Sequence, residues 1–134
     1  MEQPYLAIKV VMMPRDLNPA NTIFGGVLLS YIDQAAAIGA RHEINQLHGK
    51  APLLVTVAMD KIEFKKPVLV GDVVSFRTRR VKLGRTSITI HVDVEAERGG
   101  EKLSVTEAEV VYVAVAKQPD GRLLPTPIQP ESNP

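Results

Sequence analysis

The 134-residue sequence contains no cysteine and no tryptophan. Without cysteine the chain forms no disulfide, offers no thiolate nucleophile and cannot bind zinc or an iron–sulfur cluster through sulfur. Net charge is also nearly absent, because 16 basic side chains are balanced by 15 acidic ones. That balance argues against a protein that covers nucleic acid with positive charge. No apolar run approaches the roughly 20 residues of a membrane-spanning helix, and the first residues lack a signal-peptide pattern. These absences predict one cytoplasmic domain that binds neither nucleic acid nor membrane.

The first half of the sequence predicts a strand, an ordered loop and one long helix. Residues 5–13 are mostly apolar and end at Pro14, whereas residues 15–22 are rich in Asn, Asp and Pro, which favour turns. Residues 27–44 have helical periodicity, and three consecutive alanines add propensity. At 100° per residue, an apolar stripe is formed by Leu28, Ile32, Ala35, Ala36 and Gly39, and the opposite face by Ser30, Gln34, Ala37 and Arg41. Such a small-residue stripe suits a helix lying close against a sheet.

The second half has the two-residue period of strands. Strands are predicted over residues 53–64, 73–83, 88–97 and 103–116, with glycine-containing turns at 71–72, 84–85 and 99–100. The last strand changes phase near Thr106-Glu107, which indicates a bulge. Residues 110–116 are apolar on both faces, so this strand lies centrally or its outer face is covered by another subunit.

One helix cannot cover both faces of such a sheet. The sequence therefore predicts an α+β fold in which a curved antiparallel sheet wraps around a single central helix. Residues 1–117 form this domain. Five of the ten prolines lie from Pro119 onward, so residues 118–134 are predicted to be an extended, loose tail.

Asp33 is the first candidate for chemistry. It lies in the middle of the predicted helix, where Asp has poor propensity, at the border of the polar face. A structural interpretation makes it half-solvated or capped by a neighbouring hydroxyl group. A functional interpretation makes it a partly desolvated carboxylate that serves as general base or nucleophile.

Gly25 and Gly26 precede the predicted helix and also allow two interpretations. They provide a tight entrance to the helix, or their N–H groups at the positive helix end stabilise a developing oxyanion. The spacing alone does not separate the two.

A basic cluster lies in the predicted strand 73–83 and the turn that follows it. Arg77, Arg79, Arg80, Lys82 and Arg85 lie in a stretch, residues 73–92, that contains no acidic residue. The cluster either protects a strand edge by charge or binds the phosphates of a small anionic ligand. Nucleic acid is disfavoured because no aromatic residues interleave it. The three histidines, His42, His48 and His91, lack the spacing of metal ligands, so no metal site is expected. No serine-hydrolase elbow or P-loop is present.

Taken together, several motifs resemble the acyl-CoA thioester hydrolases of the hotdog fold, in the branch of the bacterial YciA-type and the brain-type acyl-CoA hydrolases. The resemblance covers nearly all of residues 8–117. Its specific part is the spacing of Met13-Pro14-x-Asp16-x-Asn18, Ile23-Phe24-Gly25-Gly26 and Ile32-Asp33-x-Ala35. Supporting motifs are Val55-Thr56-Val57, Phe64-x-Lys66-Pro67, Val70-Gly71-Asp72, Gly84-Arg85-Thr86-Ser87 and Val105-Thr106-x-Ala108.

The resemblance implies that an acyl-CoA is hydrolysed to a carboxylic acid and CoA, with no cofactor because CoA is part of the substrate. It implies that Asp33 is the catalytic carboxylate, that Asn18 of a partner subunit orients water or the thioester, and that Gly25 or Gly26 donates an N–H to the thioester oxygen. The turn Gly84-Arg85-Thr86-Ser87 would line the CoA path, with Arg79 and Lys82 from the basic cluster. A homodimer is the implied minimum unit, and a hexamer of three dimers the implied assembly.

One position departs from the family pattern. Asn21 stands where the family usually has glycine, and Asn is the least costly substitute in a left-handed turn, so the loop is expected to keep its shape. An alternative function is a non-catalytic acyl-CoA-binding or sensing domain, which would need an output element that these 134 residues do not hold. Dehydratase chemistry is weaker, because no His precedes Asp33.

Overall fold

A computed structural model describes residues 3–47, 49–50 and 53–130. The chain runs from strand β1 (Tyr5–Val11) through a 3₁₀ turn (Pro14–Asp16) into helix α1 (Gly25–Gln46), and then into a series of strands. These are β2 (Gly49–Lys50), β3 (Leu53–Asp60), β4 (Val73–Leu83), β5 (Ser87–Arg98), β6 (Glu101–Lys117), β7 (Leu123–Pro125) and β8 (Gln129–Pro130). No helix in the described ranges is long and apolar enough to cross a membrane.

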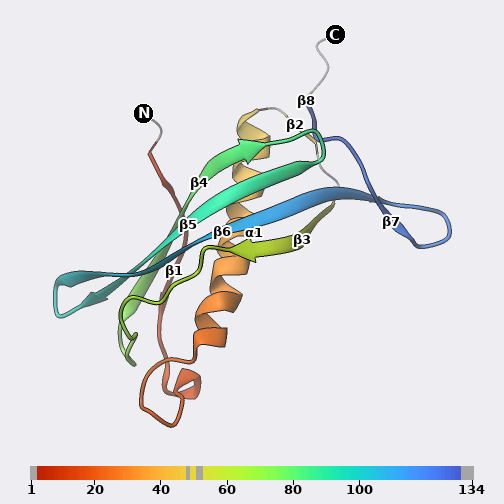
Figure 1. Cartoon of the computed structure of the whole chain (residues 1–134). Helices are drawn as coiled ribbons and strands as arrows, with labels where there is room; N and C mark the ends of the chain where they lie inside the picture. Colours follow the sequence, from red (N-terminus) through yellow and green to blue (C-terminus); the bar gives the residue numbers. More distant parts are fainter. Residues whose placement is uncertain (1–2, 48, 51–52, 131–134) are drawn as a thin grey trace.

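Five strands form an antiparallel sheet in the order β1-β4-β5-β6-β3, and β7 adds to β6 as its sixth strand. The sheet is curved and α1 lies across one of its faces (Figure 1). This is the predicted α+β arrangement of one helix and a curved sheet. The two strands at the sheet edges, β1 and β3, each have one side that no other described strand covers.

The apolar stripe of α1 is buried against the sheet as predicted. All five of its residues are buried, and Ala40 and Ile44 extend the stripe. They pack on alternating residues of the inner sheet face, which include Phe76, Ile88, Ile90 and Val92. The helix begins two residues earlier and ends two residues later than predicted. Because the stripe sets the rotation of the helix, it also determines where Asp33 lies.

Backbone irregularities lie close to the predicted places. The β5–β6 ladder shifts register where Val94 pairs with Thr106 and Glu95 with Ser104, so Val105 forms a bulge next to the predicted position. Asn21 has φ +62°, which is the left-handed conformation expected for it. The strand β6 lies between β5 and β3, which is the central position that the sequence allowed, and cover of its outer face by another subunit stays a prediction.

One predicted boundary and the predicted loose tail need correction. The strand predicted over residues 53–64 ends at Asp60, and Lys61 takes a left-handed φ of 58°. The tail is partly bound to the domain: β7 pairs with β6, and β8 pairs with β2. Residues 126 and 128 add backbone bonds, from Thr126 N–H to the Ala114 carbonyl and from Ile128 N–H to the Arg85 carbonyl. β7 is held by a short hairpin with the end of β6, whereas β8 and Ile128 contact residues distant in sequence, and proline content indicates neither.

Candidate active site

The Asp33 carboxylate lies between α1 and the sheet, where two hydroxyl groups reach it. Thr56 of β3 donates a hydrogen bond of 2.7 Å to Oδ1, and the Tyr112 hydroxyl of β6 lies 2.7 Å from the same oxygen. The Tyr112 hydroxyl is also 2.5 Å from the main-chain oxygen of Asp33. Asp33 itself is half-buried. It therefore has the neighbouring hydroxyl groups of the structural interpretation and the partial desolvation of the functional one.

Sheet register explains why these groups meet. Thr56 pairs with Tyr112 across the β3–β6 ladder, and Tyr112 pairs with Ile88 across β5–β6. One position along, Ser87 pairs with Val113. The turn at residues 84–87 therefore ends one residue before Ile88, which belongs to the same cross-strand row as Thr56 and Tyr112, the two residues that contact Asp33. Backbone bonds fix this turn, from Gly84 N–H to the Ser87 carbonyl and from Ala114 N–H to the Thr86 carbonyl.

Gly25 and Gly26 form the first turn of α1. Phe24 is the N-cap residue and offers no side-chain acceptor, and Val27 and Leu28 donate to its carbonyl. A methyl group on Gly26 would meet no atom within 4 Å, and one on Gly25 would make only ordinary contacts with the Phe64 ring at 3.8 Å. Packing within this chain therefore does not require glycine at either position. Both leave the positive end of the helix open to a close approach from outside.

A cavity of about 280 Å³ lies beside this helix end. Among the residues that line it are Gly25, Leu28, Phe64, Lys65 and Lys66. The cavity is therefore bordered by the backbone at the start of α1, by apolar side chains and by two lysines. Asp33 is not among the residues that line it.

Asn18 organises the loop that leads into α1. Its Oδ1 accepts the N–H groups of Ala20 and Thr22 at 2.9 and 3.1 Å, and its Nδ2 donates to Thr22 Oγ1 at 2.8 Å. This is the Asx-type bonding that the composition of residues 15–22 predicts. The side chain is committed to its own loop, and one hydrogen of its amide is left for an external acceptor.

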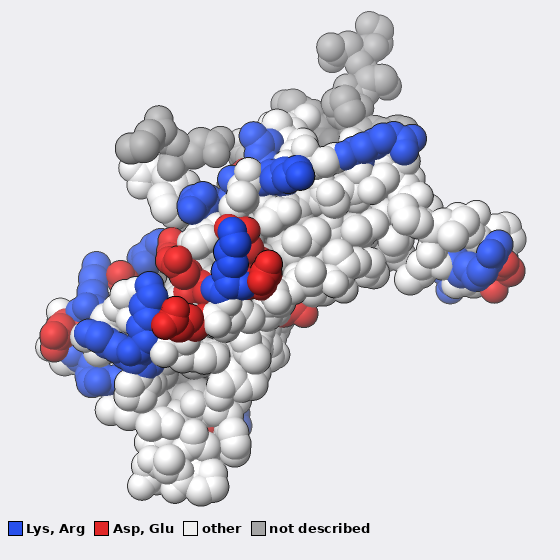
Figure 2. Space-filling model, in the orientation of Figure 1, with Lys and Arg blue, Asp and Glu red and all other residues white. Residues whose placement is uncertain are grey.

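The basic cluster does not act as one patch. Figure 2 shows basic side chains along β4, with acidic side chains gathered beside them toward the β5–β6 hairpin. Arg77 pairs with Glu95 at 3.4 Å, and Arg79 lines a separate cavity of about 210 Å³ with Tyr5 and His42. Lys82 and Arg85 are exposed near the turn at 84–87. Of the cluster, Arg85 lies in that turn, and Lys82 is nearer to it than Arg79 is.

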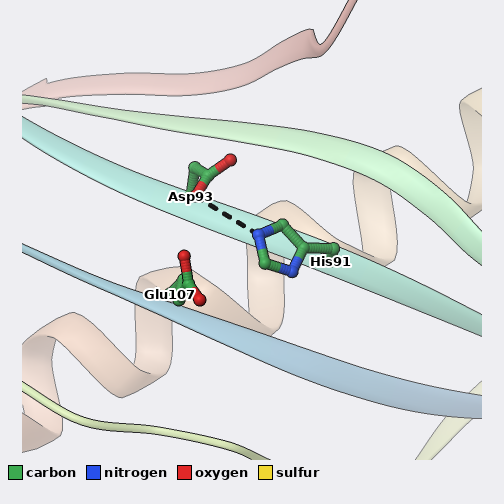
Figure 3. A group of neighbouring side chains, drawn as sticks. All are labelled: His91, Asp93 and Glu107. Carbon is green, nitrogen blue, oxygen red and sulfur yellow. Dashed lines mark hydrogen bonds and ion pairs between the residues drawn. The ribbon is translucent and has the colours of Figure 1, made fainter. Parts of the chain in front are cut away.

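A second group of polar side chains lies on the outer sheet face, away from α1 (Figure 3). His91 and Asp93 of β5 and Glu107 of β6 place one ligand atom each within 4.8 Å of the others. His91 is buried, and its Nε2 lies 3.2 Å from Asp93 Oδ1. The His91–Asp93 contact accounts for this pair without an ion. The expectation that no metal is bound stays a prediction, and His48 lies outside the described residues.

Comparison with known proteins decides the family. A family model for the thioesterase superfamily matches residues 20–103. The chain belongs to the thioesterase superfamily. It is 42% identical to the acyl-CoA thioester hydrolase YciA of Salmonella typhimurium over 132 residues, which cover 95% of this chain and 93% of that protein. It is 39% identical to the Escherichia coli acyl-CoA thioester hydrolase YciA over 125 residues, covering 90% of each chain.

Solved structures agree with this membership. A hexameric hotdog fold thioesterase of Campylobacter jejuni superposes with a TM-score of 0.79 at 41% identity, covering 93% of this chain and 90% of that one. A hexameric broad specificity acyl-coenzyme A thioesterase superposes with a TM-score of 0.80 at 33% identity, covering 99% and 86%. This superfamily member therefore has the hotdog fold that the sequence motifs indicated.

Sequence reasoning missed two residues of this superfamily member that contact Asp33. Tyr112 was not chosen because it lies in a strand of apolar residues, and Thr56 was noted only as part of a motif. The signal available for Tyr112 was a lone phenol in an apolar run, since a buried Tyr hydroxyl usually finds a partner. The partner itself, 79 residues away, could not be identified from the sequence.

Proposed function

We propose that this chain hydrolyses acyl-CoA thioesters to a free carboxylic acid and CoA, with Asp33 as the carboxylate that acts on the thioester. The observation that carries the proposal is the Asp33 carboxylate held through Oδ1 by Thr56 and Tyr112. In the described part of the chain, both hydrogen bonds to this side chain end on Oδ1, which leaves Oδ2 for chemistry. The acyl-CoA hydrolases among its relatives support the substrate class.

The reaction needs only two elements from the protein. A thioester carbonyl is already electrophilic, so a carboxylate and an oxyanion site suffice, and no cofactor is proposed. Oδ2 of Asp33 takes a proton from water as the water attacks, or it attacks the carbonyl itself, expels CoA thiolate and gives a mixed anhydride that water opens. A single turnover in heavy-oxygen water separates the routes, because label in Asp33 would eliminate direct attack by water.

Helix geometry supports a site built from two chains. Gly25 and Gly26 lie eight and seven residues before Asp33, a separation of roughly 10–12 Å along the helix axis. An oxyanion donor and an attacking carboxylate must each lie within about 3 Å of one carbonyl group. Asp33 of one subunit is therefore proposed to work with the helix end and Asn18 of another. The uncovered edge of β3, next to Thr56, is the proposed place of contact.

The remaining assignments follow from this arrangement. The turn at Gly84, Arg85, Thr86 and Ser87 is proposed to line the CoA path, with Lys82 and Arg79 as further phosphate contacts. Lys65 and Lys66, beside the helix end, are additional candidates for phosphate binding. Hexameric relatives support a hexamer built from such dimers. A cytoplasmic location without nucleic-acid or membrane partners stays a prediction.

The proposed role of Asp33 is tested with Asp33→Asn and Asp33→Ala. Both changes remove the base or nucleophile, so kcat should fall by about 10²–10⁴-fold for several acyl-CoAs. The measurement is release of free CoA thiol across a panel of chain lengths, together with equilibrium binding of CoA.

Asp120→Asn, an exposed carboxylate in the β6–β7 turn, is the matched control and should keep wild-type turnover. Near-wild-type hydrolysis by either Asp33 variant would refute the assignment. A wild-type protein that binds acyl-CoA without releasing CoA would instead support the binding-domain alternative.

A further inference from the structure

We infer that Tyr112 is a positioning residue of this site, whose hydroxyl holds the Asp33 carboxylate so that Oδ1 is occupied and Oδ2 is presented for the reaction. The inference rests on the proposed role of Asp33 and deepens it. Tyr112 is 2% exposed and its hydroxyl contacts Asp33, so it acts through the carboxylate.

Both hydrogen-bond acceptors of the Tyr112 hydroxyl belong to Asp33. A single hydroxyl lies 2.5 Å from the main-chain oxygen of Asp33 and 2.7 Å from its Oδ1. The two acceptors belong to the backbone and the side chain of the same residue, so the phenol links the carboxylate to the helix that carries it. This restricts rotation of the Asp33 side chain, which in a half-buried position would otherwise exchange rotamers.

The direction of the hydrogen bond is fixed by protonation. Tyr112 is 2% exposed, and burial, followed by the hydrogen bond to Asp33, raises the pKa of the phenol above its ordinary value. The phenol therefore remains protonated throughout the neutral range. A carbonyl oxygen and a carboxylate oxygen are both acceptors, so Tyr112 is the donor and shares its one hydrogen between them.

Thr56 and Tyr112 hold the same oxygen in different ways. Thr56 is exposed on the edge strand β3, where a second subunit or a substrate would approach, and its hydroxyl can exchange partners there. Tyr112 approaches from the interior, in a strand whose neighbours on the same face, Val110 and Ala114, are apolar and buried. Tyr112 is thus the permanent contact, and Thr56 the one accessible to ligands.

A change of Tyr112→Phe removes the hydroxyl and keeps the ring. The Asp33 oxygens keep Thr56 and solvent as partners, so the fold should remain and the midpoint of thermal unfolding should change little. Loss of a hydrogen bond to a charged group should lower kcat by about 10–100-fold with KM changed less than about twofold. Tyr5→Phe, on β1 at the far end of the helix, is the control and should leave both unchanged.

Replacing Tyr112 by 3-fluorotyrosine tests the same point without removing any contact. The more acidic phenol is a stronger hydrogen-bond donor and keeps the contact, so kcat should stay near the wild-type value while KM changes little. Wild-type kcat in Tyr112→Phe would overturn the inference, and so would a 3-fluorotyrosine form whose kcat falls as far as that of Tyr112→Phe. An inactive Asp33→Asn beside a fully active Tyr112→Phe would remove the role of Tyr112 and leave that of Asp33, whereas an active Asp33→Asn would remove the proposed function itself.

Discussion

A buried ion pair joins the two ends of the β4–β5 hairpin. Asp72, which is 2% exposed, accepts from Arg98 Nε at 2.9 Å and from Nη2 at 2.8 Å, and also from the N–H of Leu69 at 2.9 Å. The hydrogen bond with Arg98 is the largest cause that lowers the pKa of Asp72, against a smaller opposing effect of burial. The bidentate contact therefore favours the ionised carboxylate in the folded protein.

We expect Arg98→Met to lower the free energy of unfolding at pH 7 by about 1–2 kcal/mol, a modest value because solvent screens the partly exposed Arg98. The pKa of Asp72 is lower folded than unfolded, so this stability is present above the unfolded value of about 3.9 and is lost as pH falls through the folded value. The melting temperatures of wild type and variant, measured from pH 7 to 3, should converge below about pH 4. Arg77→Met, which breaks a more exposed pair, should show little difference at any pH. A pH-independent gap for Arg98→Met would contradict the account.

The contact between α1 and β4 depends on one glycine. An ideal Cβ on Gly39 would lie 2.7 Å from the Cβ of Thr78 and would also collide with its Oγ1. Thr78 is buried in β4, so neither side can easily give way. At Gly39, the small-residue stripe seen in the sequence allows the helix to approach the sheet closely.

We expect Gly39→Ala to destabilise the fold. Alanine gains about 1 kcal/mol in helix propensity, but overpacking a buried contact costs about 1–3 kcal/mol, so the net effect should be a loss of up to about 2 kcal/mol. Chemical denaturation of Gly39→Ala, Thr78→Ala and the double variant measures it. The alanine at 39 should cost less when Thr78 is also shortened. A more stable single variant would show that the contact is looser than described.

Hydrophobic periodicity was sufficient to predict the elements that bury one face. It was insufficient to predict those that are stabilised by pairing with another strand. The stripe of α1 and the alternation of β5 follow from residues near in sequence, and both were predicted within two residues. The end of β3 at Asp60 and the docking of β7 and β8 follow from pairing with other strands. The proline content of the tail indicated an extended backbone, and β7 and β8 are extended strands. It could not indicate which strands they pair with.

The same distinction applies to the candidate site, where some residues could be chosen from the sequence and others are linked to it only by the fold. Asp33 and the glycine pair could be chosen from their positions in and before the helix, whereas Asn18 received its role only from the resemblance to a family. Tyr112 could not, since its hydroxyl meets Asp33 only when β6 lies under the middle of α1. The roughly 10–12 Å helical separation between the glycine pair and Asp33 likewise acquires meaning only when a second chain is considered.

The edge strand β3 is therefore where the assembly can be tested. Its outer side is covered by no other described strand, and Val57, 56% exposed, lies next to the Thr56 that contacts Asp33. An uncovered edge bearing apolar side chains is normally protected or paired. A second copy of this strand would cover it and bring another helix end toward Asp33.

We expect Val57→Asp to weaken this pairing by burying a charge, giving a smaller species by size-exclusion chromatography with light scattering. Since the helix-end donors would then be lost from the site, kcat/KM should fall by about a hundredfold. Activity should partly recover as protein concentration rises, because association is driven by mass action. Leu123→Asp, 46% exposed on β7, is the control and should keep both assembly and turnover. A Val57→Asp monomer with full activity would show that one chain suffices, and an unchanged oligomer with unchanged activity would show that subunits do not meet at β3.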